Sequence, residues 1–301
     1  MAYQIYICDV FTDRRFGGNQ LAVLPDASGL SDKQMLSIAR EFNFSESTFV
    51  LAPEDAQNTR KVRIFTPGGE VPFAGHPNVG TAFVLAATNT VPCDSDNDLF
   101  RFEEKAGVVP VRVERRSENT IFCELTAPEP LSLGASVNSE AVAHALHLGP
   151  DAVVSTRHPP RCTSVGLPFL VTELADLKAL AKAQSDLNRL RPLLSESGAR
   201  GIHIYTRNCP DTDWDMQARM YSAGLGISED AATGSANVAL AALLAHLDDA
   251  KAKDYQWTIA QGVEMGRPSL LEARASKADG ELTSVRIGGT SVMVAEGQIE
   301  V

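Results

Sequence analysis

The sequence lacks the marks of secreted, membrane-spanning and nucleic-acid-binding proteins. Its 301 residues include five cysteines at wide spacing with no CxxC pair, which argues against a disulfide framework and a structural zinc site. Asp and Glu outnumber Lys and Arg by 38 to 27, and the net charge of −11 disfavours nucleic acid as a partner. No apolar run approaches the roughly 18 residues of a membrane span. The first residues also lack a signal peptide, so we expect a cytoplasmic protein.

Motifs of the common cofactor and metal enzymes are missing as well. The chain has no GxxxxGK[ST], no GxGxxG after a strand, no GxSxG and no HExxH. His144 and His147 are three residues apart on a predicted helix, but no third ligand is in view, so we interpret them as surface residues. Nucleotide-fold oxidoreductases, P-loop enzymes, serine hydrolases and zincins therefore lack support.

The composition that remains is that of an ordinary folded protein, with 44% hydrophobic and 22% charged residues. Hydrophobic spacing predicts helices over 31–42, 139–148 and 176–194, and two helices of small and apolar residues over 75–87 and 233–247. An opening strand is predicted near Ile5, and further strands at residues 21–24, 48–51, 62–65, 100–102, 108–113, 120–125, 201–206, 216–221, 256–260, 270–275, 285–287 and 291–295.

Two segments of the first half recur in the second. Residues 63–68, Arg-Ile-Phe-Thr-Pro-Gly, resemble residues 219–224, Arg-Met-Tyr-Ser-Ala-Gly, at an offset of 156. Residues 80–82, Gly-Thr-Ala, resemble residues 234–236, Gly-Ser-Ala, at an offset of 154, so we expect a two-residue deletion between the two matches. Each half then contains a strand, a glycine turn, a polar loop and a buried helix, which indicates an internal duplication.

The duplication predicts the architecture. Two buried helices, each surrounded by short strands, favour an α+β fold of two similar halves, each a barrel-like β-sheet wrapped around a central α-helix. We place the N-terminal half at residues 1–128 and the C-terminal half at residues 129–301, with the last strand free to return to the first half. The offset of 154 places His76 opposite Asp230. Facing helix N-termini would then form one anion site between the halves.

Three side chains are candidates for chemistry. Glu46 lies between Phe44 and Phe49, where partial desolvation would suit acid/base work; the alternative is a solvated loop carboxylate. His76 sits at a predicted helix start, where the helix dipole disfavours its cationic form; the alternative is a capping or packing histidine. Asp230 precedes the second buried helix, and its alternative role is that of an ordinary N-terminal cap.

Small residues at the two helix starts are candidates for ligand binding. Gly75 and Gly234 would let a ligand approach the backbone closely, although a turn with positive φ would also require glycine. Ser235 could donate its hydroxyl and backbone N–H to a carboxylate, or serve only as a small packing residue. The expected ligand group is therefore an anion such as a carboxylate.

Six short segments together resemble a known family, the PhzF or phenazine-biosynthesis isomerase-like proteins, from about residue 3 to 300. They are Phe16-Gly17-Gly18-Asn19, Ser45-Glu46-Ser47-Thr48, Arg63-Ile64-Phe65-Thr66-Pro67, Pro72-Phe73-Ala74-Gly75-His76-Pro77, Glu229-Asp230-Ala231-Ala232-Thr233-Gly234-Ser235-Ala236 and Gly266-Arg267-Pro268-Ser269.

The resemblance implies the fold of diaminopimelate epimerase, with the active site between two similar halves. It implies a homodimeric isomerase that moves a proton between ring carbons of a small carboxylated substrate, such as trans-2,3-dihydro-3-hydroxyanthranilate, without metal or organic cofactor. It assigns Glu46 as the general acid/base, with His76 and Asp230 as further catalytic residues. It assigns substrate binding to Asn19, Gly75, Gly234 and Ser235.

The sequence departs from the family pattern beside these residues. Ala231 stands where proline is common in the EDPATGS segment, and Gln20 stands where GNP has its proline. Two other functions stay open: an epimerase or lyase acting on a related hydroxy or amino acid, and a non-catalytic protein that binds a small molecule. No cysteine lies near either helix start, which argues against two-thiol racemase chemistry.

Overall fold

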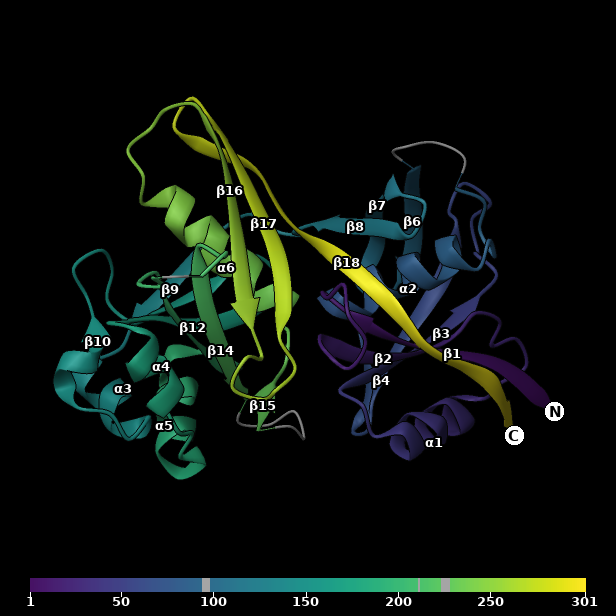
Figure 1. Ribbon diagram of the computed structural model, residues 1–301, viewed down its shortest axis with the longest axis horizontal. Helices are drawn as coiled ribbons and strands as arrows, with labels where there is room; N and C mark the ends of the chain where they lie inside the picture. The colour runs from purple at the N-terminus through teal and green to yellow at the C-terminus, as the bar shows by residue number, and fades with distance from the viewer. Residues whose placement is uncertain (94–97, 211, 223–227) are drawn as a thin grey trace. The chain divides into compact units, whose positions relative to one another are not determined.

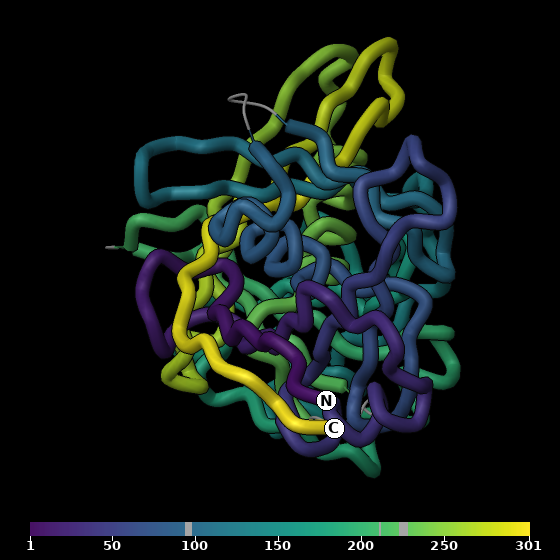
Figure 2. The backbone as a smooth tube through the Cα atoms, turned by 90° about the vertical axis from the view of Figure 1, so that its right-hand side faces the viewer, coloured from purple at the N-terminus to yellow at the C-terminus, as the bar shows by residue number. Residues whose placement is uncertain are grey.

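A computed structural model describes residues 1–93, 98–210, 212–222 and 228–301 of the chain (Figure 1). The chain divides into two compact units, the first formed by residues 1–126 with 288–301 and the second by residues 127–287. The chain ends belong to the first unit and lie side by side (Figure 2), where the Met1 amino group donates a hydrogen bond to the Val301 carbonyl at 2.9 Å.

The strands of the first unit form a closed circuit. β18 pairs with β1, and the pairing continues through β2, β3, β4, β6, β7 and β8, which pairs again with β18. Its elements are β1 (Ala2–Val10), β2 (Asn19–Leu24), α1 (Asp32–Phe42), β3 (Glu46–Leu51), β4 (Arg60–Thr66), β5 (Gly69–Val71), α2 (Gly75–Ala87), β6 (Asp98–Glu104), β7 (Gly107–Ser117), β8 (Thr120–Thr126) and the end of β18 (Glu281–Glu300).

Helix α2 is the central helix of this unit. It packs against β1, β2, β3, β7 and β8, and each of its residues from Gly75 to Ala86 is buried (Figure 1). This follows from its composition, since small and apolar side chains on every face leave no surface that favours water. Gly80 allows the close approach, because a Cβ there would meet Leu21 and Val10 side-chain atoms at 2.6 Å.

Helix α1 is amphipathic and covers the outside of the same sheet. Ser31 caps it through a capping box with Gln34, and Asn43 ends it in the left-handed conformation. Met35, Ile38 and Ala39 pack with the aromatic side chains of the sheet in a separate hydrophobic cluster. The expected helix over 31–42 is thus confirmed.

The second unit repeats this plan around α6. Pairing runs from β9 through β11, β12, β13, β14 and β16 to β17, with β10 on β12 and β15 on β14. Its elements are β9 (Ser132–Ser136), α3 (Ser139–Ala145), the short 3₁₀ helix η1 (Pro150–Ala152), β10 (Val153–Val154), β11 (Arg161–Ser164), β12 (Pro168–Leu174), α4 (Leu177–Lys182), α5 (Leu187–Ser197), β13 (Gly201–Thr206), β14 (Met216–Ser222), β15 (Glu229–Asp230), α6 (Gly234–His246), β16 (Lys253–Gln261), β17 (Ser269–Ala278) and the start of β18.

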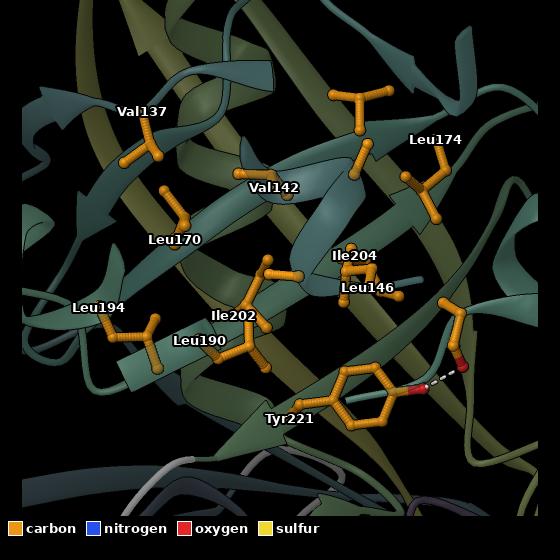
Figure 3. Packing of buried hydrophobic residues seen from close by; sticks show 14 of the residues in the cluster. Val137, Val142, Leu146, Leu170, Leu174, Leu190, Leu194, Ile202, Ile204 and Tyr221 are labelled. Carbon is orange, nitrogen blue, oxygen red and sulfur yellow. Dashed lines mark hydrogen bonds between the residues drawn. The ribbon is translucent and has the colours of Figure 1, made fainter. Parts of the chain in front are cut away.

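The second unit has two buried regions. Helix α6 packs against β11, β12, β16 and β17. On the other side of the sheet, α3, α4 and α5 cover a cluster that includes Leu146, Leu190 and Ile202 (Figure 3). In it, the Tyr221 hydroxyl donates to the Ala183 carbonyl at 2.9 Å, which satisfies a polar group that would be costly to bury alone. The predicted fold class is confirmed, since each unit is a barrel-like sheet around a central helix.

Two predicted elements differ from the structure. The helix expected over 176–194 is two helices, because Asp186 ends the intervening segment and caps α5 by accepting from the Asn188 amide. The strands expected at 285–287 and 291–295 are one continuous strand, β18. Gly288 serves close packing here, since a Cβ there would meet Cys123 O at 2.7 Å.

The pairing registers define the internal repeat. Arg63 donates to both oxygens of Glu70 on β5, and Arg219 donates in the same way to Glu229 on β15. Phe65 pairs with Glu70, as Tyr221 pairs with Glu229. The strands β4 and β14 therefore match at the expected offset of 156.

The expected two-residue deletion is wrong. Helices α2 and α6 begin at Gly75 and Gly234, so the second unit carries three additional residues before its helix. His76 therefore corresponds to Ser235, and Asp230 corresponds to Val71 rather than to His76. The error arose because Gly-Thr-Ala and Gly-Ser-Ala match by small-residue composition and not by position in the helix.

Candidate active site

The general-base candidate and the histidine candidate lie together in the first unit. Glu46 begins β3, and its Oε2 lies 3.6 Å from Nε2 of His76 in the first turn of α2. The Glu46 side chain is 19% exposed and that of His76 is 5% exposed. A carboxylate that solvent and a ligand can both reach, backed by a buried imidazole, is an arrangement suited to proton transfer.

The His76 ring is neutral. Burial lowers its pKa to about 3, while a backbone hydrogen bond with Gln20 acts in the opposite direction. Its Nδ1 lies 3.4 Å from Nδ2 of Asn19, the first residue of β2. A neutral imidazole can exchange hydrogen bonds with a ligand without adding charge to the site.

Asn19 is held by the turn before it. Gly18 has a φ of 62°, and a Cβ there would lie 2.4 Å from the Val10 carbonyl oxygen. Only glycine fits this position, so the turn directs the buried Asn19 side chain to His76 and to Ser45, whose hydroxyl is 3.5 Å from Oδ1 of Asn19.

The start of α2 has no side-chain cap. Ala74 occupies the N-cap position, and the first turn contains no acidic residue. The Asn78 amide instead donates to the Ala74 carbonyl at 3.0 Å and holds this turn in place. The uncapped N–H groups beginning at Gly75 carry the partial positive charge of the helix dipole, which favours an anion.

A hydrogen bond deeper in the unit sets the register of the pair. The Thr81 hydroxyl on α2 donates to the Thr48 hydroxyl on β3 at 2.9 Å, and both residues are fully buried. Thr48 and Glu46 lie on the same face of β3, because side chains alternate along a strand. This bond therefore fixes the strand that carries Glu46 against the helix that carries His76.

Asp230 and the helix start of the second unit form their own network. The Thr233 hydroxyl donates to Oδ2 of Asp230 at 2.7 Å, and Nε2 of Gln261 donates to the Asp230 carbonyl at 2.8 Å. Asp230 is buried, and Ala231 after it is fixed by the Ser269 hydroxyl, which donates to its carbonyl at 3.0 Å. This network holds Asp230 in one position beside the start of α6.

Gly234 and Ser235 form the first turn of α6. Gly234 is buried and Ser235 is partly exposed. Thr233 occupies the N-cap position, but its hydroxyl bonds Asp230 instead of capping the helix. The first-turn N–H groups of α6, like those of α2, thus have no side-chain cap.

The seven predicted site residues fall into two sets. Asn19, Glu46, Gly75 and His76 lie together in the first unit, and Asp230, Gly234 and Ser235 lie together in the second. Asn78 and Asn237 were not predicted. Each lies three residues after the glycine that begins its helix, so a shared Gly-x-x-Asn pattern was the signal for the correct offset.

The helix starts carry no thiol or metal cluster. The residues at the beginnings of α2 and α6 are Ala74-Gly75-His76 and Thr233-Gly234-Ser235. In the ranges that the structure describes, no group of three or more His, Cys, Asp or Glu side chains is placed to hold a metal ion. Nor is any helix in these ranges long and apolar enough to cross a membrane.

The two units together form the diaminopimelate epimerase-like fold. Residues 8–297 match the PhzC–PhzF family, described as phenazine biosynthesis-like protein. An uncharacterized isomerase of Mesorhizobium japonicum is 38% identical over 99% of this chain and 98% of its own. The trans-2,3-dihydro-3-hydroxyanthranilate isomerase of Pseudomonas aeruginosa is 36% identical over 98% of this chain and 99% of its own.

A solved structure shows the same fold. The Bacillus anthracis phenazine biosynthesis protein of the PhzF family superposes with a TM-score of 0.89 at 24% identity, covering 100% of both chains. The chain belongs to the PhzF family, and it is an isomerase.

Proposed function

We propose that this isomerase moves a proton between two carbons of a small carboxylated ring, in the manner of trans-2,3-dihydro-3-hydroxyanthranilate isomerase. The observation that supports it most is the Glu46–His76 pair, 3.6 Å apart at the uncapped start of a buried helix. The similarity to the Pseudomonas aeruginosa enzyme of that name, at 36% identity, supports the choice of substrate class.

In this proposal Glu46 is the general acid/base. Its carboxylate removes a proton from one ring carbon: the C–H bond breaks, an O–H bond forms on Glu46, and the electron pair is delocalised over the adjacent double bond. Glu46 then donates a proton to another carbon of that system. Substrate and product have the same composition and oxidation level, so the step requires neither an oxidant nor a reductant.

The other candidate residues bind and orient the substrate. Neutral His76 and Asn19 exchange hydrogen bonds with its polar groups, and the N–H groups beginning at Gly75 donate to no competing side-chain cap. The roles of Gly234, Ser235 and Asp230 in holding the substrate's carboxylate and other polar groups stay predictions of the family resemblance. The homodimer implied by the family resemblance stays a prediction.

Replacing Glu46 by Gln tests the assignment. We expect Glu46→Gln to lower kcat on trans-2,3-dihydro-3-hydroxyanthranilate by about 10²–10⁴-fold, which is the usual contribution of a positioned general acid/base. The control is Glu41→Gln, which changes an exposed carboxylate on α1. Thermal unfolding of both variants shows whether the fold is retained.

The control variant should keep wild-type turnover, and both variants should unfold at the wild-type temperature. A Glu46→Gln enzyme that turns over within about twofold of wild type would show that another group moves the proton.

A further inference from the structure

The pairing registers match Glu104 in the first unit with Gln261 in the second. Lys61 on β4 pairs with Glu103 on β6, and Gln217 on β14 pairs with Ala260 on β16. Since β4 and β14 match at an offset of 156, the next residues along β6 and β16 are equivalent. These residues are Glu104 and Gln261, the last of their strands.

Gln261 holds the start of α6 with both ends of its amide. Its Oε1 accepts from the Thr233 backbone N–H at 3.1 Å and from Nδ2 of Asn237 at 2.7 Å. Its Nε2 donates to the Asp230 carbonyl at 2.8 Å and to the Thr233 hydroxyl at 3.0 Å. One buried side chain thus serves as acceptor for the first turn and as donor for the segment before it.

Glu104 lies in the same place with a different side chain. Its carboxyl faces the side-chain amide of Asn78, the equivalent of Asn237, and both carboxyl oxygens are buried with no other partner among the described residues. Burial raises the pKa of this carboxyl to about 8, with Asn78 acting in the opposite direction. The Ala106 amide, two residues on, donates to the Pro72 carbonyl at 3.1 Å, so this strand end lies against the segment that leads into α2.

The basic side chains near Glu104 form ion pairs with other carboxylates. Glu104 lines a cavity of about 650 Å³ that also contains three basic side chains. Lys61 pairs with Glu54, and both Arg63 and Lys105 pair with Glu70. The other acidic groups of the cavity are Asp55, whose carboxylate accepts from the Gln57 amide, and Glu103, which accepts from Asn58. On α2 the titratable group is the neutral His76. None of these contacts supplies a positive charge to Glu104.

We propose that Glu104 is a positioning residue of the isomerase, holding the first turn of α2 as a neutral carboxylic acid in the way that the Gln261 amide holds α6. A neutral carboxyl has one accepting oxygen and one donating hydroxyl, which matches the acceptor and donor of an amide. An ionised carboxyl has no donor for the segment before the helix, so ionisation loosens the turn that carries Gly75 and His76. The inference rests on the proposed function, in which these two residues contact the substrate.

The pH dependence has a definite sign. The folded pKa of Glu104, about 8, lies above the ordinary value of 4.5, so the folded protein binds this proton more tightly than the unfolded chain. Its contribution to stability is complete below about pH 4.5, decreases as the pH rises and is lost above about pH 8. A glutamine at this position keeps its donor at every pH.

Glu104→Gln tests the inference through two measurements. Thermal unfolding from pH 5 to pH 9 should show wild type losing stability with rising pH relative to Glu104→Gln, with the gap widening up to about pH 8. The kcat of wild type should fall above pH 8, by up to about tenfold at pH 9, whereas Glu104→Gln should keep its activity there. Glu104→Leu, which removes both donor and acceptor, should lower kcat across the whole range.

Two controls complete the design. Glu103→Gln changes the adjacent carboxyl, whose pKa is lowered by its contacts with Asn58 and the Glu54 and Asp55 amides, and should leave the wild-type pH dependence above pH 5 unchanged. Gln261→Glu should give the second unit a new loss of stability with rising pH. The unfolding readout needs no substrate, so it distinguishes this inference from the Glu46 assignment. Parallel unfolding profiles for wild type and Glu104→Gln, or an unchanged loss of kcat above pH 8 in that variant, would overturn the inference.

Discussion

The starts of α2 and α6 have the same frame and different functional residues. Each helix begins at a glycine and has an asparagine three residues later, whose amide donates to the N-cap carbonyl at 3.0 Å in α2 and 2.9 Å in α6. The first unit adds His76 and Glu46 to this frame. The second unit has Ser235 and Gly201 at those positions.

The difference teaches which features serve the fold and which serve the chemistry. Features present in both copies, such as the Arg–Glu pair and the capping asparagine, satisfy buried polar groups that any such barrel would contain. Features present in only one copy are not needed to satisfy such buried polar groups. Glu46 and His76 belong to this second kind, which supports a catalytic assignment for the first unit and a binding assignment for Ser235.

Of the two equivalent arginines, Arg219 should contribute more to stability. Arg219 bonds Glu229 and also donates to the Leu180 and Ala183 carbonyls at 2.9 and 3.0 Å. We expect Arg219→Ala to lower the free energy of unfolding by about 3 kcal/mol, because it leaves the partly buried Glu229 carboxylate without this donor and removes one donor from each of the Leu180 and Ala183 carbonyls.

Arg63→Ala is the matched variant in the first unit. We expect a loss of only about 1 kcal/mol, because Lys105 still pairs with Glu70 and the other partner, Asp32, is exposed. Urea unfolding of both variants measures the contrast. Equal losses would mean that the two pairs play the same part and that the additional carbonyl contacts of Arg219 contribute nothing.

Removing the Thr81–Thr48 bond gives a smaller effect. Thr81→Val leaves the buried Thr48 hydroxyl without its donor, so we expect a loss of about 1 kcal/mol in the free energy of unfolding. The second unit offers the control: Thr172 on β12 is equally buried, and its hydroxyl has no partner among the described residues. Thr172→Val should be neutral or stabilising, and a loss there as large as that of Thr81→Val would remove the special role of the bond.

Local sequence patterns predicted many of the helices and strands. The uninterrupted small and apolar run predicted a helix at 75–87, and the structure has α2 at Gly75–Ala87. The Ser31 capping signal and the alternation in β4 are local in the same sense. The internal duplication predicted two barrel-like halves, and the resemblance to the PhzF family added the diaminopimelate epimerase-like type of fold.

What the patterns could not supply depends on contacts between distant residues. The three residues that separate the two offsets lie between β14 and β15, where residues 223–227 are outside the described residues. Glu104 lies beyond the strand predicted at 100–102, and nothing nearby in the sequence shows that the end of β6 lies against Asn78. The contact between Glu46 and His76, which lies 30 residues further along the chain, also cannot be predicted from the sequence spacing alone.

The central claim is that one carboxylate moves a proton from one carbon to another. The most direct measurement is the position of deuterium in the product formed from trans-2,3-dihydro-3-hydroxyanthranilate in D₂O, read by NMR. The account predicts a product with the isomerised double bond. Because the proton on the Glu46 carboxyl exchanges with solvent, this product should carry deuterium at the newly protonated carbon. Deuterium at the original carbon with inverted configuration would show an epimerase and contradict the account.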